Sequence, residues 1–273
     1  MKFEATAVLL TSELDEAVRH SEIAGIRSGI EAVRRLYPDE RADSIELLGG
    51  LVAFTGIDSP LSQAYGVGVG LRATQQDVRR ASEFYERRSA TPRVFVTPLT
   101  DPTLALELAS AGFAPAEYEN VLVCDDFAYA RRDERIAVAS DVDTWARASA
   151  EAFLDRDVLQ PDDDRIAKII ATSDGVCALE GRDDAGAGIA ATSAMDVRGE
   201  WSALFAGSTI RRFRRQGWHA AMIRDRMARA RETGVRFLRA TAKPASASER
   251  NFRRCGFTTI YTRTLWERRR HGE

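Results

Sequence analysis

The segment Ser208-Thr-Ile-Arg-Arg-Phe-Arg-Arg-Gln-Gly-Trp-His-Ala-Ala-Met222 contains the junction that decides the fold. It follows a run of strand-forming residues that ends near Gly207, and it leads into a helical pattern that begins at about Gly217. A strand, a basic loop and a helix in this order place the first backbone N–H groups of the helix beside the loop. These groups have no partner within the helix and lie at the positive end of its dipole, so the junction predicts an anion site.

Two features of the loop suit a phosphate ligand. Gly217 has no Cβ, so a phosphate can approach the backbone closely at that position. Arg211, Arg212, Arg214 and Arg215 supply positive charge for a ligand that carries several phosphates. A solvated basic loop at a helix start has the same composition, and the loop alone does not decide between the two interpretations.

The rest of the chain predicts two similar halves. In the second half we expect helices at 143–153, 164–170, 217–232 and 246–255, and strands at 176–180, 188–196, 201–207, 235–240 and 258–266. In the first half we expect helices at 12–37, 73–88 and 102–111, and strands at 44–48, 51–55, 64–69, 93–96 and 118–123. Each half ends in a Gly-Phe pair, at Gly112-Phe113 and Gly256-Phe257, before an alternating strand. The common order predicts an internal duplication and an α/β fold with two mixed-sheet domains, residues 1–130 and 131–273, joined by a polar stretch at 124–134.

Composition limits the classes of function. The chain has 273 residues, with 39 Lys and Arg against 41 Asp and Glu, and this net charge of −2 argues against general nucleic-acid binding. Its three cysteines form no CxxC pair and its three histidines are scattered, so neither a disulfide framework nor a metal site is expected. Residues 1–10 do not have the pattern of a signal peptide, and no apolar run reaches the roughly 20 residues that cross a bilayer. We therefore expect a cytoplasmic protein without a membrane or nucleic-acid partner.

The basic loop that precedes the helix at Gly217 resembles the pyrophosphate loop of the GNAT superfamily of N-acetyltransferases. In that family the loop reads Arg/Gln-x-x-Gly-x-Gly/Ala, and Arg214 to His219 matches it at the first and fourth positions, with His219 where glycine or alanine is usual. The segment from Ala245 to Phe257 is similar to the fourth helix of the family, which ends in Gly-Phe. Ser246 and Glu249 in this segment also form a capping-box pattern, which predicts helix initiation.

The resemblance implies two tandem acetyltransferase-type domains, of which the C-terminal one binds acetyl-CoA as cosubstrate, without a metal. It places the cofactor between the fourth and fifth strands of that domain. The cofactor-binding residues that it implies are Thr209, Ile210, Arg214, Arg215, Gln216, Gly217, Trp218, His219, Ser248 and Asn251.

The equivalent junction of the first half lacks this loop. The stretch from Gly66 to Gly70 has glycines but no Arg-x-x-Gly, and Thr74 with Asp77 is an N-cap pattern that brings an acid to the helix start. An acid there repels phosphate, so we interpret the first half as a degenerate acetyltransferase-like domain.

Candidate catalytic residues are less well defined. The family often uses a tyrosine as the acid four residues before the glycine of Gly-Phe, and this position is Phe252. Tyr261 is a substitute, although a strand tyrosine often only packs. Glu200 and Asp196 are candidate bases, and each also fits the description of a turn carboxylate. Because positioning alone can supply much of the rate, a distinct base is not required.

Two functions follow from these observations. The first is transfer of an acetyl group from acetyl-CoA to a primary amine of a small molecule or peptide, by direct attack of the neutral amine. The alternative is a non-catalytic acyl-CoA-binding sensor or regulatory module. The sequence leaves a monomer and a homodimer open.

Overall fold

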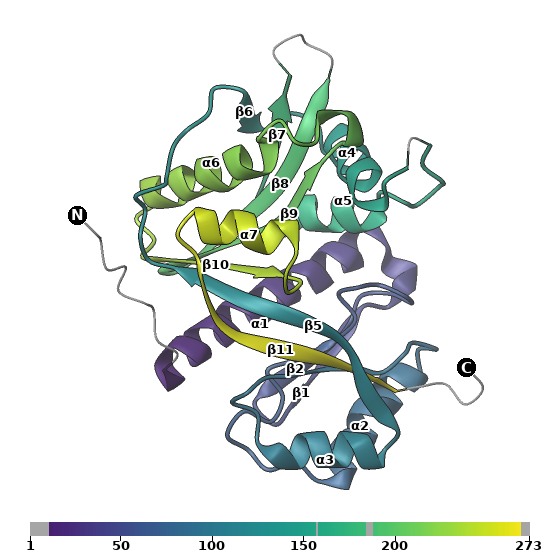
Figure 1. Ribbon diagram of the computed structural model, residues 1–273. Coiled ribbons are helices and arrows are strands. Elements are labelled where there is room, and N and C mark those ends of the chain that lie inside the picture. Colours follow the sequence, from purple (N-terminus) through teal and green to yellow (C-terminus); the bar gives the residue numbers. More distant parts are fainter. Residues whose placement is uncertain (1–10, 157, 184–187, 269–273) are drawn as a thin grey trace. The chain divides into compact units, whose positions relative to one another are not determined.

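The structure is a computed structural model that describes residues 11–156, 158–183 and 188–268. The segment 1–10, which we interpreted as lacking a signal peptide, lies outside the described residues. Contacts divide the chain into two compact units. The first unit contains Ser12–Asn120 and the residues from Tyr261 on, and the second unit contains Val121–Ile260. Most helices and strands of both are labelled in Figure 1.

The first unit is built on a long amphipathic helix and a sheet in the strand order β1-β2-β3-β4-β11. Strand β11 is antiparallel to β4. The core of this unit includes Val52, Phe84, Tyr85 and Leu108. Its elements are α1 (Ser12–Leu36), η1 (Pro38–Glu40), β1 (Asp43–Leu47), β2 (Gly50–Phe54), β3 (Ala64–Tyr65), α2 (Gln75–Glu86), β4 (Arg93–Val96), α3 (Pro102–Ser110), the first part of β5 (Phe113–Cys124) and most of β11 (Thr258–Arg268).

The second unit has the strand order β5-β10-β9-β8-β7-β6. Its strands β6 to β9 are antiparallel neighbours, whereas β9 and β10 are parallel. Besides the end of β5, its elements are β6 (Ile136–Val138), α4 (Val142–Leu154), α5 (Arg165–Thr172), β7 (Val176–Arg182), β8 (Ile189–Arg198), β9 (Trp201–Thr209), η2 (Arg211–Phe213), α6 (Trp218–Glu232), β10 (Phe237–Ala242) and α7 (Ala247–Arg254).

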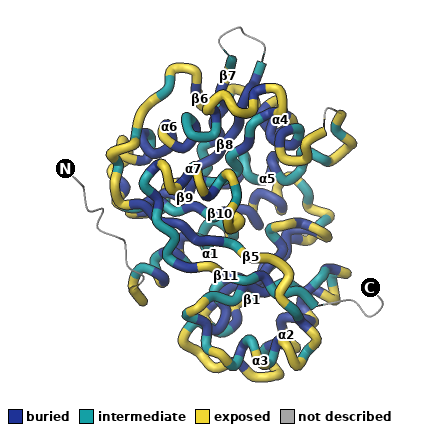
Figure 2. The backbone as a smooth tube through the Cα atoms, viewed as in Figure 1, coloured by how far each residue is buried: buried dark blue, intermediate teal, exposed yellow. Residues whose placement is uncertain are grey.

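Helices cover both faces of the second unit's sheet. Met222 and Ile223 of α6 and Phe252 of α7 share one core cluster with Leu204 of β9. On the other face, Trp145 of α4 is fully buried and donates its indole N–H to the carbonyl of Leu179 at 2.9 Å. Strands β8 and β9 are accordingly among the most buried parts of the chain (Figure 2).

The last strand of each half, β5 and β11, is divided between the two units. Strand β11 pairs with β4 through Thr264 and Val96 in the first unit, while the end of β5 lies beside β10 in the second. The sequence analysis assigned 258–266 to the second domain, but the structure places it from Tyr261 on in the first unit. Both strands alternate apolar and polar residues, so either could complete either sheet, and only the three-dimensional pairing distinguishes them. The domain boundary at 130/131 stays a prediction.

Several predicted strands differ in length for local reasons. Strand β3 stops at Tyr65, because Gly66, Gly68 and Gly70 all take φ values between 65° and 74° that end the extended backbone. Strand β6 was not predicted, and it directly follows the polar stretch at 124–134. None of the helices within the described ranges is both long and apolar enough to cross a membrane.

Candidate active site

Pairing between the parallel strands β9 and β10 of the second unit stops part-way along both strands. Strand β9 continues from Leu204 to Thr209 and β10 from Ala240 to Ala242, where no pairing joins the described residues of the two strands. We call the space between these segments the strand gap. The strands pair over three positions only, Trp201 with Phe237, Ser202 with Leu238 and Ala203 with Arg239.

A β-bulge marks the point where β9 leaves β10. The register of β8 against β9 shifts between Thr192 and Ala194, so Ala206 and Gly207 lie opposite the single residue Ser193. Ala206 takes a left-handed φ of 49°. A bulge bends and twists its strand, and here it gives a physical reason for the divergence of β9 from β10.

The end of β9 presents backbone groups to the strand gap. The N–H of Ile210 is used by the carbonyl of Ala190 on β8 at 3.0 Å. Because alternate residues of a strand direct their backbone groups to opposite sides, the N–H of Thr209 faces away from β8. The Thr209 hydroxyl is buried and has no hydrogen-bond partner among the described residues. Thr209 is therefore the better candidate of this predicted pair for a ligand contact.

Helix α6 begins directly after the loop without a cap of its own. Gly217 is its N-cap residue, with φ 84° and no side-chain hydrogen bond to the first turn. A Cβ built on Gly217 would meet nothing within 4 Å, so the space in front of the helix is open. The side chain of Trp218 is buried against Gly181, which leaves only its backbone N–H for a ligand. The first turn of α6 therefore has no side-chain cap, as the predicted anion site requires, and the site itself stays a prediction.

Most of the loop arginines are already paired with acids at the end of α4. Arg211 and Arg214 contact the carboxylate of Asp155 at 3.1 and 2.9 Å, and Arg212 contacts that of Glu151 at 3.4 Å. The hydrogen bond from Arg211 helps to hold the pKa of Asp155 below its usual value. Arg215, at φ 66°, makes no ion pair with any residue that the structure describes. The four arginines are therefore not equivalent, and Arg215 is the one most available to a phosphate.

His219 points into the unit and not to solvent. Its Nδ1 lies 3.2 Å from the amide nitrogen of Asn251 on α7. An amide nitrogen only donates, so Nδ1 accepts and the ring hydrogen is on Nε2. The imidazole also packs edge-on against Phe252, with ring centroids 6.0 Å apart. The predicted residues His219 and Asn251 are thus brought together, and both line the space between α6 and α7.

The remaining predicted cofactor contacts are more peripheral. Gln216 is exposed and donates to the carbonyl of Arg212 at 3.3 Å. Ser248 is half-buried on α7. The predicted capping pattern is present in part: the Ser246 hydroxyl accepts from the N–H of Glu249, whereas the Glu249 carboxylate accepts from Ala245.

The candidate bases lie near the start of β9, with Glu200 just before it and Asp196 on the neighbouring strand β8. Glu200 precedes Trp201, so seven residues of strand, about 23 Å, separate it from Gly207. Its carboxylate is 61% exposed and pairs with Arg236. Both oxygens of Asp196 are occupied, one by the N–H of Ala203 and the other by Arg198. Whether either carboxylate acts as a base stays a prediction.

The candidate acid Tyr261 belongs to the first unit. Its phenol is buried and hydrogen-bonded to the carboxyl of Asp15 on α1. Burial, and then the carboxylates of Glu22 and Asp15, raise the pKa of Tyr261. Its catalytic role stays a prediction, and a packing role accounts for its contacts.

A cavity of about 480 Å³ lies on the α4 side of the sheet, at the end of β9. It is partly apolar and carries both signs of charge, from Arg147, Glu151 and Arg212. Its lining residues are Thr144, Arg147, Ala148, Glu151, Val158, Leu159, Ile189, Ile210 and Arg212.

Sequence reasoning missed Arg226, a fully buried arginine of α6. One signal for it exists in the sequence. Arg226 lies one helical turn from Met222 and Ala230, on the apolar stripe that packs against the sheet. A charged residue on such a stripe needs internal partners.

The burial of His219 predicts a pH dependence of stability. Burial and the charge of Arg226 lower the pKa of His219 from 6.5 to about 4. Between these values the unfolded chain binds more protons than the folded one, so the free energy of unfolding should fall by up to about 3 kcal/mol as the pH drops from 6.5 to 4. Urea unfolding of the wild type and of His219→Gln across this range measures the difference. The exposed His20→Gln is the matched control and should keep the wild-type profile; identical profiles for all three proteins would contradict the assignment.

The fold of this chain is that of the GCN5-related N-acetyltransferases (GNAT). Solved structures confirm the assignment of the fold. A GCN5-related N-acetyltransferase from Kribbella flavida matches with a TM-score of 0.62 at 16% identity, over 89% of this chain and 93% of its own. A tandem GNAT protein from the clavulanic acid biosynthesis pathway matches with a TM-score of 0.58 at 13% identity, over 96% and 98% of the two chains.

A further N-acetyltransferase of this type, from Sphaerobacter thermophilus, matches with a TM-score of 0.57 at 16% identity, over 84% of this chain and 76% of its own. No protein-family model and no curated protein sequence matches the chain. The predicted two-domain α/β fold is therefore confirmed by structural similarity.

Proposed function

We propose that this chain transfers an acetyl group from acetyl-CoA to a primary amine of a small molecule or peptide. The observation that carries the proposal is the start of α6 at Gly217, which is uncapped and open and follows the end of β9 in the chain. The residues fit a CoA ligand. The first turn of α6 and Arg215 would hold the pyrophosphate, and the unpartnered hydroxyl of Thr209 suits a polar arm along β9.

Acetyl-CoA supplies an activated acyl group, and the chain's own residues need to position the amine. The cavity beside Ile210 is our proposed acceptor site. Glu151 there would attract an ammonium group, and Arg147 would attract a carboxylate or another anionic group of the acceptor. The amine must lose its proton before it attacks, and solvent in this open cavity can accept that proton.

Calorimetry with acetyl-CoA, followed by thiol-release assays with a panel of amines, amino acids and peptides, tests the function. We expect binding, and thiol release that depends on the amine. Failure to bind acetyl-CoA would overturn the proposal.

Acyl-CoA binding without transfer remains a second candidate. Two observations favour this second function. Phe252 stands where a phenol could serve as the acid, and Glu200 lies far from the bulge. Binding with no thiol release for any amine, and no acylation of the protein, would select this function.

We expect one acetyl-CoA for each chain. At the equivalent junction of the first unit, the hydroxyl of Thr74 accepts from the N–H of Asp77, and the carboxylate of Asp77 accepts from the N–H of Thr74 at 2.9 Å. The predicted N-cap is therefore present, and it occupies the donors that a phosphate would need. Calorimetry on the full chain should give a stoichiometry near one, and two sites of similar affinity would contradict this expectation.

A further inference from the structure

Arg226 on α6 has a buried hydrogen-bond donor with no acceptor. Its guanidinium donates from Nε to the carbonyl of Met222, and from Nη1 to the carbonyls of Ala194 and Phe205, at 3.0 to 3.1 Å. These last two carbonyls belong to Ala194 and Phe205, which pair with each other directly before the bulge of β9. Nη2 is buried and has no partner among the described residues. A buried donor without an acceptor destabilises the folded state unless a ligand or a water accepts its hydrogen bond.

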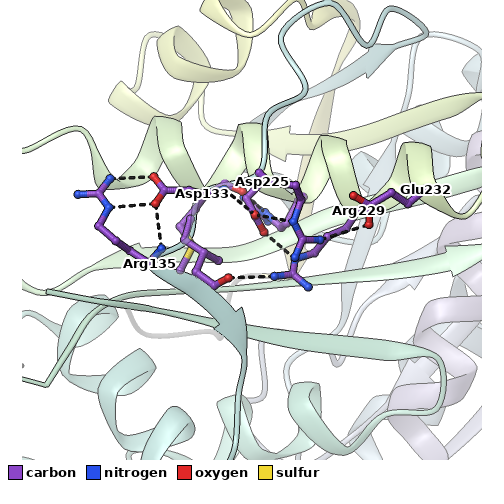
Figure 3. A network of polar contacts seen from close by, with 9 residues as sticks. Asp133, Arg135, Asp225, Arg229 and Glu232 are labelled. Carbon is purple, nitrogen blue, oxygen red and sulfur yellow. Dashed lines mark hydrogen bonds and ion pairs between the residues drawn. The ribbon is translucent and has the colours of Figure 1, made fainter. Parts of the chain in front are cut away.

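The charge of Arg226 is also uncompensated by a direct ion pair. The adjacent Asp225 is fully buried, but its carboxylate pairs with Arg229 at 2.6 Å and Arg132 at 3.3 Å (Figure 3). No carboxylate of the described residues forms an ion pair with Arg226. Burial lowers the pKa of Arg226 to about 9, so the group still carries its charge at neutral pH. A single cation therefore lies beneath the bulge.

A second donor lies beside the same space. A Cβ built on Gly207 would lie 3.4 Å from Nη2 of Arg226 and 3.5 Å from Nε2 of His219, the nitrogen that carries the ring hydrogen. The missing Cβ thus leaves room for one atom or small group between two N–H donors. We call Nη2 of Arg226, Nε2 of His219 and the space at Gly207 the donor cradle.

The donor cradle adjoins the strand gap. Gly207 is a bulge residue in the part of β9 that has left β10, and it is partly exposed although it lies in the interior of a strand. A ligand in the gap can therefore reach it. A buried water could accept both N–H groups, but it would leave the charge of Arg226 without a counter-charge.

We propose that the donor cradle stabilises the negative charge that develops when a thioester is cleaved in the strand gap. This inference rests on the proposed acetyl transfer. In that reaction the amine nitrogen bonds to the acyl carbon, the carbon–sulfur bond breaks, the sulfur leaves with the electron pair and the amine's proton passes to solvent. Negative charge appears on the acyl oxygen and on the sulfur, and two fixed donors in a site of low dielectric stabilise either atom.

The neutral state of His219 suits this role. Its pKa of about 4 keeps the ring uncharged at neutral pH, and the hydrogen bond from Asn251 keeps the hydrogen on Nε2. His219 therefore donates a hydrogen bond without having to lose a proton, while Arg226 supplies the charge.

The variant Gly207→Ala tests the donor cradle with a minimal change. Gly207 does not have a left-handed φ, and its new methyl group would make contacts of ordinary length, so the fold should be retained. Gly29→Ala in α1 is the matched control, because its new Cβ would meet nothing within 4 Å and would lie in the first unit, away from the donor cradle. We expect Gly207→Ala to lower the rate of thiol release about 100-fold, the typical effect of losing a transition-state donor. The affinity for acetyl-CoA should change less than threefold.

A second readout does not depend on turnover. The thiol pKa of bound CoA, measured by thiolate absorbance, should lie about one unit or more below that of free CoA in the wild type and Gly29→Ala, because a fixed cation favours the thiolate. Gly207→Ala and His219→Phe should bring it back towards the free value. His219→Phe keeps a ring in place and serves if the alanine variant does not fold.

The outcomes show whether the sulfur or the acyl oxygen is stabilised, and they distinguish failure of the donor cradle from failure of the proposed acetyl transfer. A lowered thiol pKa that the variants restore supports stabilisation of the sulfur, whereas a slower rate at an unchanged thiol pKa supports stabilisation of the acyl oxygen. Unchanged rate and unchanged thiol pKa in both variants would overturn the donor cradle alone. Absence of acetyl-CoA binding by the wild type would instead remove the proposed function, and the donor cradle with it.

Discussion

Replacement of Gly217 with aspartate is expected to abolish acetyl-CoA binding while the chain stays folded. The new carboxylate would lie at the uncapped start of α6, where it would repel phosphate and could itself accept from the first turn. Both effects remove the anion site, and together they should weaken binding by more than about 100-fold, which corresponds to at least ~2.7 kcal/mol. The fold should tolerate the change, because the space is open and aspartate is among the residues that adopt a left-handed φ most readily.

The matched variant Gly217→Asn separates charge from shape. Asparagine has nearly the same size, adopts the same backbone conformation and can cap the helix, but it carries no charge. We therefore expect an intermediate loss of affinity, about tenfold. Calorimetry gives the affinities, and thermal unfolding followed by circular dichroism shows whether the variants are folded. Wild-type affinity in a folded Gly217→Asp protein would mean that the phosphates bind elsewhere.

The sequence predicts a helix or strand well where the apolar residues follow a single helical or strand period. Helix α1 begins and ends within one residue of its expected limits, because its apolar stripe runs for 25 residues up to Pro38. Strand β4 has the limits expected from its β-branched run. In contrast, the unit to which β11 belongs depends on pairing with β4, some 170 residues earlier in the chain, and no local pattern contains that information.

The same distinction applies to the site. Gly217 and the loop are visible because the strand, loop and helix are contiguous. The pairing of Arg211 with Asp155 joins residues 56 positions apart, so the sequence could not show that most of the loop's charge is already compensated. His219 and Asn251 were identified through the resemblance to a family, but only the structure shows that they contact each other. Arg226 lies among apolar residues whose period alone predicts a buried helix face.

Arg263 on β11 is the charged group whose loss should destabilise the first unit most. It is buried and donates to Glu22 of α1 at 2.8 Å and to Glu119 of β5 at 2.7 and 2.9 Å, and its guanidinium lies 4.0 Å from the ring centre of Phe95. Burial opposes its charge, but the two carboxylates outweigh burial and raise the pKa of Arg263. Because Arg263→Met would leave two poorly solvated carboxylates without a cation, we expect a loss of about 3–5 kcal/mol in the free energy of unfolding.

The control for Arg263→Met is Arg236→Met in the second unit. Arg236 pairs with Glu200, and both side chains are more than 60% exposed, so its loss should cost at most about 1 kcal/mol. Urea unfolding at neutral pH measures both values. A loss for Arg263→Met no larger than that for Arg236→Met would show that β11 is held in the first unit by its apolar contacts and not by this ion cluster.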